Sequence, residues 1–519
     1  MTDRRKAVTV LTFNTLAFTV CFAVWTMNGV LVSFLVDNQL FRFDKAQIGW
    51  LLGTPILSGS IVRLPIGMLT DRWGGRIVFP IVMLVAAAGA VMASYADSYH
   101  SLLLAGLVFG LAGTGFAVGI AYTSVWFPMS KQGTALGIFG VGNAGAAVTS
   151  MLGPVILNRL SRGGADLERW RLFPRLYAAA LVVMAVVFVL FTHTRTVDAA
   201  RTRTLRQQLA PLSDVRVWRF GLYYFLVFGG FVGLAQWLIP YYLNVYAVSL
   251  ATAGLLAAMF TLPSGVIRAL GGWLSDRLGA RRVMYWVFGS CVVGFLLLIV
   301  PRMDILSPGE GVMAATKGEV TAVSAEEIAV GARRYKLRTE PPPPNADQAS
   351  LIWPTSRYWQ EPVVKAGDRV VKKQILARGI THVFFQANIW IFTFLVLVLG
   401  VATGIGKAAV YKHIPEYFPT DVGVVGGIVG VIGGLGGFVC PLLFGYFLKW
   451  TGVWTTCWVF LFAVSVVCLA WMHIVIDRML RKKAPQLADK IEGDPTQTAA
   501  SAAPAAPAAV LPDAVPAGR

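Results

Sequence analysis

Apolar residues are grouped into twelve long runs along the chain, and short polar stretches separate them. The runs cover approximately 8–36, 46–70, 77–96, 100–127, 132–158, 173–192, 218–247, 251–272, 283–300, 382–411, 421–448 and 453–476. A helix needs about 20 apolar residues to cross the hydrocarbon core of a bilayer. A segment in lipid must satisfy its own backbone, so we expect every run to be a helix. The pattern predicts an all-α polytopic membrane protein with twelve transmembrane helices.

The composition agrees with this prediction and excludes a string of soluble domains. Hydrophobic residues make up 56% of the 519 residues and charged residues only 14%, whereas a soluble chain carries roughly 25% charge. The formal net charge of +19 is a value that nucleic-acid-binding proteins also reach, but the apolar runs favour the lipid bilayer as the partner. The five cysteines lie inside apolar runs without CxxC spacing, so we expect buried thiols and no metal site.

Two stretches of the first half recur in the second. SGSIVRLPIGMLTDRWGGR places Arg63 eight residues before Asp71, and SGVIRALGGWLSDRLGARR places Arg268 eight residues before Asp276. The offset between the two copies is 205 residues. A second pair, GIFGVGNAGAA from Gly137 and GIVGVIGGLGG from Gly427, has an offset of 290. The chain is therefore predicted to contain two six-helix repeats, the second enlarged by an insertion between its third and fourth helices.

These offsets predict the domain organisation. We expect an N-terminal six-helix bundle over 1–192, a cytoplasmic linker over 193–217, and a C-terminal six-helix bundle over 218–300 and 381–480. The insertion over 301–380 is polar, and by default we interpret it as a solvated linker. Its segment VVKAGDRVVKKQILARG alternates around a Gly-Asp turn, which is also typical of a β-hairpin. The Ala/Pro-rich tail over 481–519 is predicted to be disordered.

Basic residues are concentrated on the side of the membrane that holds the N-terminus. The positive-inside rule therefore favours cytoplasmic termini, although the loop between the fifth and sixth runs is also basic. Two of the inner loops are related by the repeat and are rich in glycine and charge. We interpret them as cytoplasmic gates in which an Asp–Arg contact forms in one state and breaks in another, with simple anchoring to the membrane as the alternative. Their residues are Asp71, Arg72, Arg76, Asp276, Arg277 and Arg281.

Away from their ends, the apolar runs contain three cations and no carboxylate. Arg63, Arg268 and Lys407 each carry the cost of a charge inside a membrane, about 2.5–3.5 kcal/mol on insertion scales. Two arginines at repeat-related positions need a counter-charge, and a transported anion supplies one. A guanidinium group suits a planar oxyanion because its N–H groups donate in parallel pairs. The alternative is that each arginine reaches an interface or backbone carbonyls.

Two further polar residues lie in these runs. Lys407 is either a third anion contact, a group for proton coupling, or a lysine that extends to the inner surface. Asn143 is an amide among glycines, and it can donate to an anion where helices approach closely.

These residues resemble signatures of a known family. G-x-L-x-D-R-x-G-G-R at Gly67–Arg76 and its second copy resemble the loop motif of the major facilitator superfamily. The glycine stretches, with G-x-G-N-x-G at Gly140–Gly145 and Phe-x-x-Pro at Phe438–Pro441, resemble those of the nitrate/nitrite porter family. The similarity covers about 1–300 and 380–480.

The resemblance implies the major facilitator fold with one central site. Arg63 and Arg268 match the two arginines that clamp the substrate, and Tyr224 matches a tyrosine that hydrogen-bonds the anion. Phe116 matches an aromatic residue that packs against the planar ion, with Phe22 and Trp25 as companions. The position that pairs with Asn143 in the second half is Gly433, so the site is not symmetric.

The resemblance also implies function and location. It favours a monomeric transporter in a bacterial inner membrane that imports nitrate, with nitrite as a further substrate, by alternating access and without a cofactor. Lys407 and the insertion favour nitrate/proton symport, and nitrate/nitrite antiport or transport of another anion such as a carboxylate stay open. The insertion is then periplasmic. An enzyme or a sensor is the competing class, but the histidines are scattered and the inner segments are short.

Overall fold

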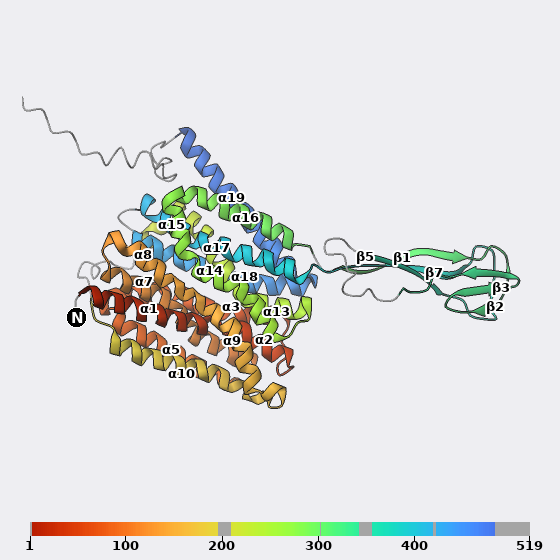
Figure 1. Ribbon diagram of the computed structural model, residues 1–519, viewed down its shortest axis with the longest axis horizontal. Helices are drawn as coiled ribbons and strands as arrows, with labels where there is room; N and C mark the ends of the chain where they lie inside the picture. Colours follow the sequence, from red (N-terminus) through yellow and green to blue (C-terminus); the bar gives the residue numbers. More distant parts are fainter. Residues whose placement is uncertain (1–2, 196–208, 301–302, 342–354, 419–421, 483–519) are drawn as a thin grey trace, which may run out of the picture.

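The computed structural model describes residues 3–195, 209–300, 303–341, 355–418 and 422–482. Helices form one block, and a narrow β-structure projects from the end of that block opposite the N-terminus (Figure 1). The tail from 483 onward and most of the 193–217 linker lie outside the described residues. The helix α19 extends to Lys482, slightly past the expected boundary at 480.

The first half contains six spans, and four of them are broken within the membrane. The helices are α1 (Asp3–Trp25), α2 (Asn28–Asp37), α3 (Lys45–Ile61), α4 (Arg63–Trp73), α5 (Gly75–Ser94), α6 (Tyr99–Phe109), α7 (Gly115–Trp126), α8 (Met129–Gly140), α9 (Gly145–Leu160) and α10 (Leu172–Phe191). Short 3₁₀ turns, η1 (Gly110–Thr114) and η2 (Val141–Ala144), interrupt the fourth and fifth spans.

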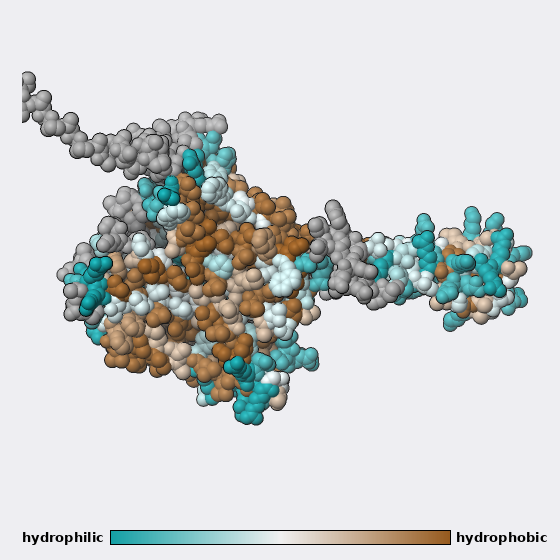
Figure 2. Space-filling view, viewed as in Figure 1, coloured by the Kyte–Doolittle hydropathy of each residue, from teal (hydrophilic) through white to brown (hydrophobic). Residues whose placement is uncertain are grey.

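The second half repeats this arrangement. Its helices are α12 (Val215–Tyr224), α13 (Gly230–Tyr246), α14 (Leu250–Val266), α15 (Arg268–Leu278), α16 (Ala280–Leu298), α17 (Ile389–Tyr417), α18 (Val422–Thr451) and α19 (Thr456–Lys482), with a π-helical turn η7 (Phe225–Gly229) between α12 and α13. Eleven helical segments of the described chain are long and apolar enough to span a membrane, and the bent pair α14–α15 supplies a twelfth. Apolar side chains cover the visible outer face of the block, as expected for contact with lipid (Figure 2).

Local sequence determines where the helices begin and turn. Asp44 caps α3 by accepting from the backbone N–H of Gln47, and the Gln47 side chain accepts from the backbone N–H of Asp44. Gly74 and Gly279 end α4 and α15 at φ values of 82° and 83°, a region that glycine enters without strain. These two glycines are 205 residues apart, so the repeat found in the sequence is also present in the backbone.

The described parts of the insertion form β-sheets, so the all-α prediction and the default of a solvated linker are wrong for residues 303–341 and 355–385. Its strands are β1 (Met303–Met313), β2 (Gly318–Val323), β3 (Glu327–Val330), β4 (Arg333–Lys336), β5 (Thr355–Pro362), β6 (Arg369–Val370) and β7 (Ile375–Phe385). They form two antiparallel sheets, in the orders β1-β7-β5 and β4-β3-β2-β6.

Apolar residues of several strands and of the adjoining turns form a second apolar core. It contains Val320, Ile328, Val370 and Leu376 among others, and it is separate from the core of the helices. The predicted Gly-Asp turn is present, with Gly367 at a φ of 94°. The strand that follows it, β6, pairs with β2, whereas β5 pairs with β7, so the strands next to the turn do not form a simple hairpin. The strand β7 extends to Phe385, and α17 consequently begins at Ile389 rather than near 382.

Glycines bring helices of the two halves into close contact near the end that bears the sheets. A Cβ atom on Gly49 of α3 would lie 2.5 Å from the carbonyl oxygen of Pro441 in α18, and one on Gly254 of α14 would lie 2.2 Å from that of Ser150 in α9. Lys449 of α18 also donates to Asp44 at 3.0 Å across the halves. This end of the interface is therefore closed.

Candidate functional site

Both repeat-related arginines stand at breaks in their spans. Arg63 is the first residue of α4 and Arg268 is the first residue of α15, and each follows a residue that ends the preceding helix. The α14–α15 pair is bent by 47° at this point. Each guanidinium group is buried, with 2% of Arg63 and 8% of Arg268 exposed. Neither arginine therefore reaches an interface, which excludes one alternative that the sequence left open.

The two guanidinium groups share one aromatic neighbour. The Cζ atom of Arg63 lies 5.1 Å from the centroid of the Phe116 ring, and that of Arg268 lies 5.4 Å from it. Phe116 is buried, and its backbone follows the 3₁₀ turn η1. The fold thus brings three of the predicted site residues together, one from each of three spans in two halves.

Arg63 also makes hydrogen bonds to backbone carbonyls. Its Nη1 donates to the carbonyl oxygen of Gly430 at 2.8 Å and its Nη2 to that of Gly113 at 3.2 Å. Both acceptors are glycines in mid-span. A Cβ atom on Gly113 would lie 2.4 Å from the Trp25 ring, and one on Gly430 would lie 3.0 Å from the Tyr411 hydroxyl. In the described part of the chain, Nε of Arg63 and Nη1 of Arg268 have no hydrogen-bond partner.

The predicted site residue Tyr224 lies at the end of α12, directly before the π-helical turn. Its ring stacks on Phe228 at 5.0 Å and contacts Tyr411 edge-on at 5.0 Å, and both arginines are in its electrostatic surroundings. The Tyr224 hydroxyl is buried with Tyr411 and Arg268 as its polar neighbours, and it makes no well-aligned hydrogen bond to any described residue. The ring fits because position 433 is glycine, where a Cβ atom would lie 2.2 Å from it.

Asn143 and Lys407 are the other two predicted site residues. Asn143 lies in the turn η2, fully buried, and within the described ranges neither Nδ2 nor Oδ1 of its amide has a partner. The backbone of Asn143 abuts Gly265 of α14, three residues before Arg268. The Nζ atom of Lys407 is buried and lies 3.4 Å from the centroid of the Phe231 ring. Nζ likewise finds no hydrogen-bond acceptor in the part of the chain that is described.

Within the described residues, four arginine or lysine side chains are buried and no carboxylate is buried. The cations are Arg63, Arg219, Arg268 and Lys407. Burying a charge without a partner is costly, so the surroundings of the arginines favour an anion. Several polar side chains that have unmet hydrogen-bonding capacity lie around them, as a site for a small oxyanion requires.

Sequence reasoning missed Tyr411, Phe228 and Phe231. Tyr411 donates to the carbonyl oxygen of Gly426 at 3.0 Å, and its ring lies 5.6 Å from Cζ of Arg268. Tyr411 lies four residues after Lys407, and residues with this spacing share one face of a helix. This spacing was the signal in the sequence that could have identified it. Phe231 follows the Phe-Gly-Gly motif after Tyr224, and aromatic residues there are indistinguishable by sequence from lipid-facing ones.

The two loops that we interpreted as gates make contacts other than the predicted Asp–Arg contact. Asp276 pairs with Lys412 of its own half at 2.7 Å, and Arg76 donates to the carbonyl oxygen of Val189 at 3.0 Å. Arg277 lies over the ring of Trp273 at 4.8 Å. No Asp–Arg ion pair is seen for Asp71 or Arg72 within the described residues, so the gating role stays a prediction.

Metal-binding clusters and cysteines were the remaining subjects of prediction from the sequence. No group of three or more His, Cys, Asp or Glu side chains among the described residues could hold a metal ion. All five cysteines are buried and free, as the sequence predicted.

Solved structures with this fold are transporters. A bacterial homologue of the human lysosomal transporter Spinster, in an inward-facing and occupied conformation, aligns with a TM-score of 0.59 at 15% identity, over 91% of this chain and 97% of that one. The nucleoside transporter NupG aligns with a TM-score of 0.54 at 12% identity, over 91% of this chain and 100% of that one. At these identities the likeness concerns the fold alone.

Sequence relatives are more similar. The chain is 38% identical over 494 residues to a protein of Thermus thermophilus named probable nitrate/nitrite antiporter NarK1, covering 94% of this chain and 96% of that protein. It is 25% identical over 468 residues to the nitrite extrusion protein of Bacillus subtilis, covering 90% and 93%. A probable nitrate transporter, NarT, of Staphylococcus carnosus is 26% identical over 470 residues, covering 91% and 96%.

The family pattern covers most of the helical part of the chain. The sequence pattern described as the Major Facilitator Superfamily matches residues 15–315 and 375–512, and the gap in the match falls in the folded insertion. The chain is a multi-pass membrane transporter rather than an enzyme, and it belongs to the Major Facilitator Superfamily, within the nitrate/nitrite porter family.

Proposed function

We propose that the protein carries nitrate and nitrite across the membrane by alternating access, with the anion held between Arg63 and Arg268. The observation that carries this proposal is the pair of buried guanidinium groups at one aromatic ring, with no buried carboxylate in the described residues. An anion that accepts from the unpaired Nε of Arg63 and Nη1 of Arg268 supplies the missing counter-charge.

The shape of the surroundings favours a planar oxyanion. A guanidinium group donates in one plane, and the Phe116 ring offers a flat apolar wall beside it. The Tyr224 hydroxyl and the Asn143 amide add donors whose hydrogen bonds are unmet within the described chain. Nitrate and nitrite are planar and singly charged, as this set of donors requires. A carboxylate carries a substituent that the enclosing aromatic side chains disfavour.

Transport requires that the site open alternately to each side. The end of the interface that bears the sheets is closed by α3 against α18 and by the Lys449–Asp44 ion pair. Bound anion neutralises the repulsion between the two arginines and allows the halves to rock about it. We assign the inner gate to the repeated loops that contain Asp71, Arg72, Arg76, Asp276, Arg277 and Arg281.

The orientation follows from the charge distribution and the number of crossings. The insertion follows an odd number of spans, so it lies on the side opposite the N-terminus. We place both termini in the cytoplasm and the sheets outside, because the inner loops carry most of the basic residues. The protein then resides in the bacterial inner membrane and works as a monomer.

Exchange is the coupling mode that the relatives favour. The Thermus thermophilus relative, at 38% identity, is named an antiporter, so we propose nitrate/nitrite antiport first. Exchange of two monovalent anions moves no net charge, so it needs no further ion to overcome an inside-negative potential. Proton symport, which the sequence favoured, is the second candidate. The observation that favours symport is the buried ammonium group of Lys407. It has no hydrogen-bond partner in the described residues and lies over the Phe231 ring.

Proteoliposomes separate the two modes. Vesicles with the purified protein are loaded with nitrite, with nitrate or with neither, and uptake of labelled nitrate is followed with and without an imposed pH gradient. Antiport predicts that internal nitrite or nitrate stimulates uptake and that the pH gradient alone does not. Uptake into empty vesicles that responds to the pH gradient supports symport, and a Lys407→Met variant should then lose that response. Absence of uptake under every condition contradicts both.

A further inference from the structure

The fourth buried cation, Arg219, lies outside the central site. It lies at the start of the apolar run 218–247, next to the linker, yet only 6% of the residue is exposed. It lies on α12 five residues before Tyr224, which corresponds to about 7.5 Å along the helix axis. The nearest acidic residue in sequence, Asp214, instead pairs with Arg216 at 2.7 Å. In the described chain no carboxylate forms an ion pair with Arg219.

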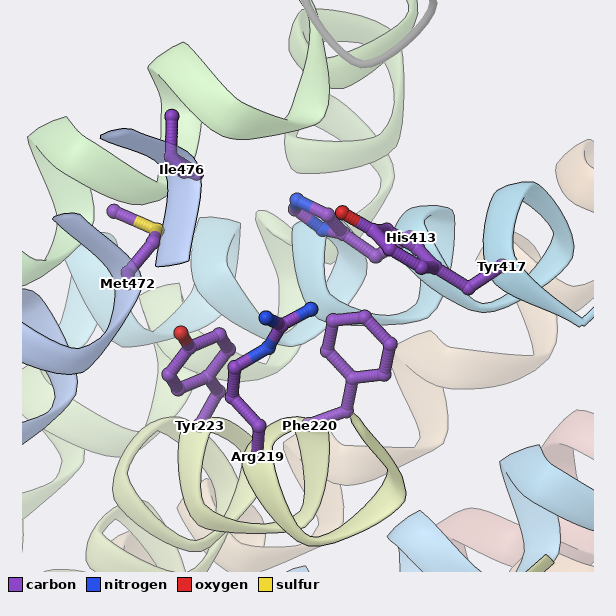
Figure 3. A pocket seen from close by; sticks show the side chains of 7 residues that line it. All are labelled: Arg219, Phe220, Tyr223, His413, Tyr417, Met472 and Ile476. Carbon is purple, nitrogen blue, oxygen red and sulfur yellow. The ribbon is translucent and has the colours of Figure 1, made fainter. Parts of the chain in front are cut away.

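A small cavity of about 20 Å³ adjoins this arginine. It lies between α12, α17 and α19 and is lined by Arg219, Phe220, Tyr223, His413, Tyr417, Met472 and Ile476. Figure 3 shows the guanidinium group extending between the rings of Phe220 and Tyr223 toward His413. A space of this size accommodates a water molecule or a small ion but no organic ligand.

The lining is rich in donors and contains no acid. Nε of Arg219 and the hydroxyl of Tyr223 are both buried, and neither has a hydrogen-bond partner among the described residues. The Cζ atom of Arg219 lies 5.0 Å from the Phe220 ring and 5.5 Å from the Tyr417 ring, and the Tyr417 hydroxyl is a hydrogen-bonding neighbour of the guanidinium.

Charges of both signs lie near the cavity. Arg216 and Arg281 contribute positive potential at Tyr417 in addition to Arg219, whereas Asp214 pairs with Arg216 and also interacts electrostatically with Arg219. The ring of His413 uses Nδ1 to contact the carbonyl oxygen of Ala409 at 2.9 Å, which fixes its orientation against the cavity. A compartment with one buried fixed positive charge, two unmet donors and no acidic residue in its lining is suited to one monovalent anion.

We propose that this cavity is a second anion site, which takes a single small inorganic anion of the size of chloride or nitrite. It differs from the central site because every lining residue belongs to the C-terminal half and none contacts Arg63 or Arg268 in the structure. Bound anion links the polar groups of α12 and α17 and stabilises the packing of these two helices. The site requires no assumption about which substrate the central arginines carry.

Thermal unfolding of the purified full-length protein tests this proposal. All variants are made in an Arg268→Lys background, which weakens the central site, and sodium chloride or sodium nitrite replaces sodium gluconate at constant ionic strength. We expect a saturable rise in Tm of a few degrees with either anion. Arg219→Gln should abolish this rise. Arg216→Gln, which removes a paired and more exposed arginine from the same helix, should retain it.

Tyr223→Phe provides a second variant that folds even if Arg219→Gln does not. Removing a buried hydroxyl without a protein partner is expected to leave the anion-free protein as stable or slightly more so. The anion concentration for half-maximal stabilisation should rise about tenfold, because one hydrogen bond to a charged group is lost. The proposal is overturned if Tyr223→Phe responds as its parent does, if Arg219→Gln still shows the rise, or if the parent shows none. Failure of the central-site proposal would leave these outcomes unchanged, because every protein that is compared carries Arg268→Lys.

Discussion

At the scale of single residues, the central site depends on one glycine as much as on its polar groups. Gly433 leaves room for the Tyr224 ring, and an added Cβ atom would lie 2.2 Å from it. We expect Gly433→Ala to displace the ring. The overpacking should destabilise the arrangement that binds the anion by about 1–3 kcal/mol and lower the rate of anion exchange about tenfold. Gly427→Ala is the matched control, because a Cβ atom there meets nothing within 4 Å. Equal exchange rates in the two variants contradict this role of Tyr224.

Asn143 permits a test in which function and stability change in opposite directions. Its amide is buried and lacks partners in the described chain, and a buried unsatisfied group costs about 1–3 kcal/mol. Asn143→Ala should therefore leave the Tm of the anion-free protein unchanged or raised while nitrate affinity falls. Titration of Tm with nitrate measures both quantities. A large loss of stability without anion would indicate that the amide has a structural partner.

The sequence predicted most of the central residues because their chemistry is conspicuous in lipid. Arg63, Arg268 and Lys407 stand out as charges in apolar runs, and the structure buries all three. Tyr411 was missed because an aromatic residue in a membrane helix is ordinary unless its partners are known. Arg219 could not be identified as buried from the sequence, because a charge one turn from a helix end is typical of both loops and cores, and only the packing of α17 and α19 decides between them.

At the scale of elements, breaks and glycine contacts determine where the spans approach each other. The breaks before Arg63 and Arg268 follow from the repeat, and the positive φ angles of Gly74 and Gly279 could be anticipated from the paired loops. The contact of α3 with α18 could not, because it requires knowing which faces of two distant helices meet.

The ion pair between Lys449 and Asp44 should stabilise the conformation in which the outer end is closed. The backbone N–H of Gln47 first, and Lys449 next, lower the pKa of Asp44 below its ordinary value of 3.8. Lys449→Gln removes the pair but keeps the helix cap, and an exposed pair is worth about 0.2–1 kcal/mol. We expect a shift of up to about fivefold toward the outward-open state, measured from distances between spin labels on α3 and α18. Lys372→Gln on the insertion is the control.

The same ion pair gives a prediction for pH. A carboxyl group whose folded-state pKa is lowered stabilises the closed end fully above its ordinary pKa, and this contribution is lost as the pH falls through the lowered value. The difference between the parent and Lys449→Gln should therefore be constant above pH 3.8 and disappear below the folded-state pKa of Asp44. A difference that persists at lower pH would show that Lys449 acts through another group.

At the scale of the whole molecule, the sheets and the helices are two bodies with separate cores. The polar composition of 301–380 concealed the sheets because their strands are short and pair across long sequence separations, such as β1 with β7. A separate core predicts that replacing residues 303–385 with a short Gly/Ser linker leaves the helical domain folded and active in exchange. Loss of exchange by a deletion protein with a normal unfolding profile would show that the sheets take part in transport.

The central claim concerns the pair of arginines, and nitrate uptake into nitrite-loaded proteoliposomes tests it most directly. Arg63→Lys and Arg268→Lys keep the charge but lose the parallel N–H donors, whereas Arg175→Lys alters an arginine outside the central site, which donates to Ser94. The account predicts that either central variant lowers uptake at least about a hundredfold while Arg175→Lys transports normally. Near-normal uptake by Arg63→Lys or Arg268→Lys would contradict it.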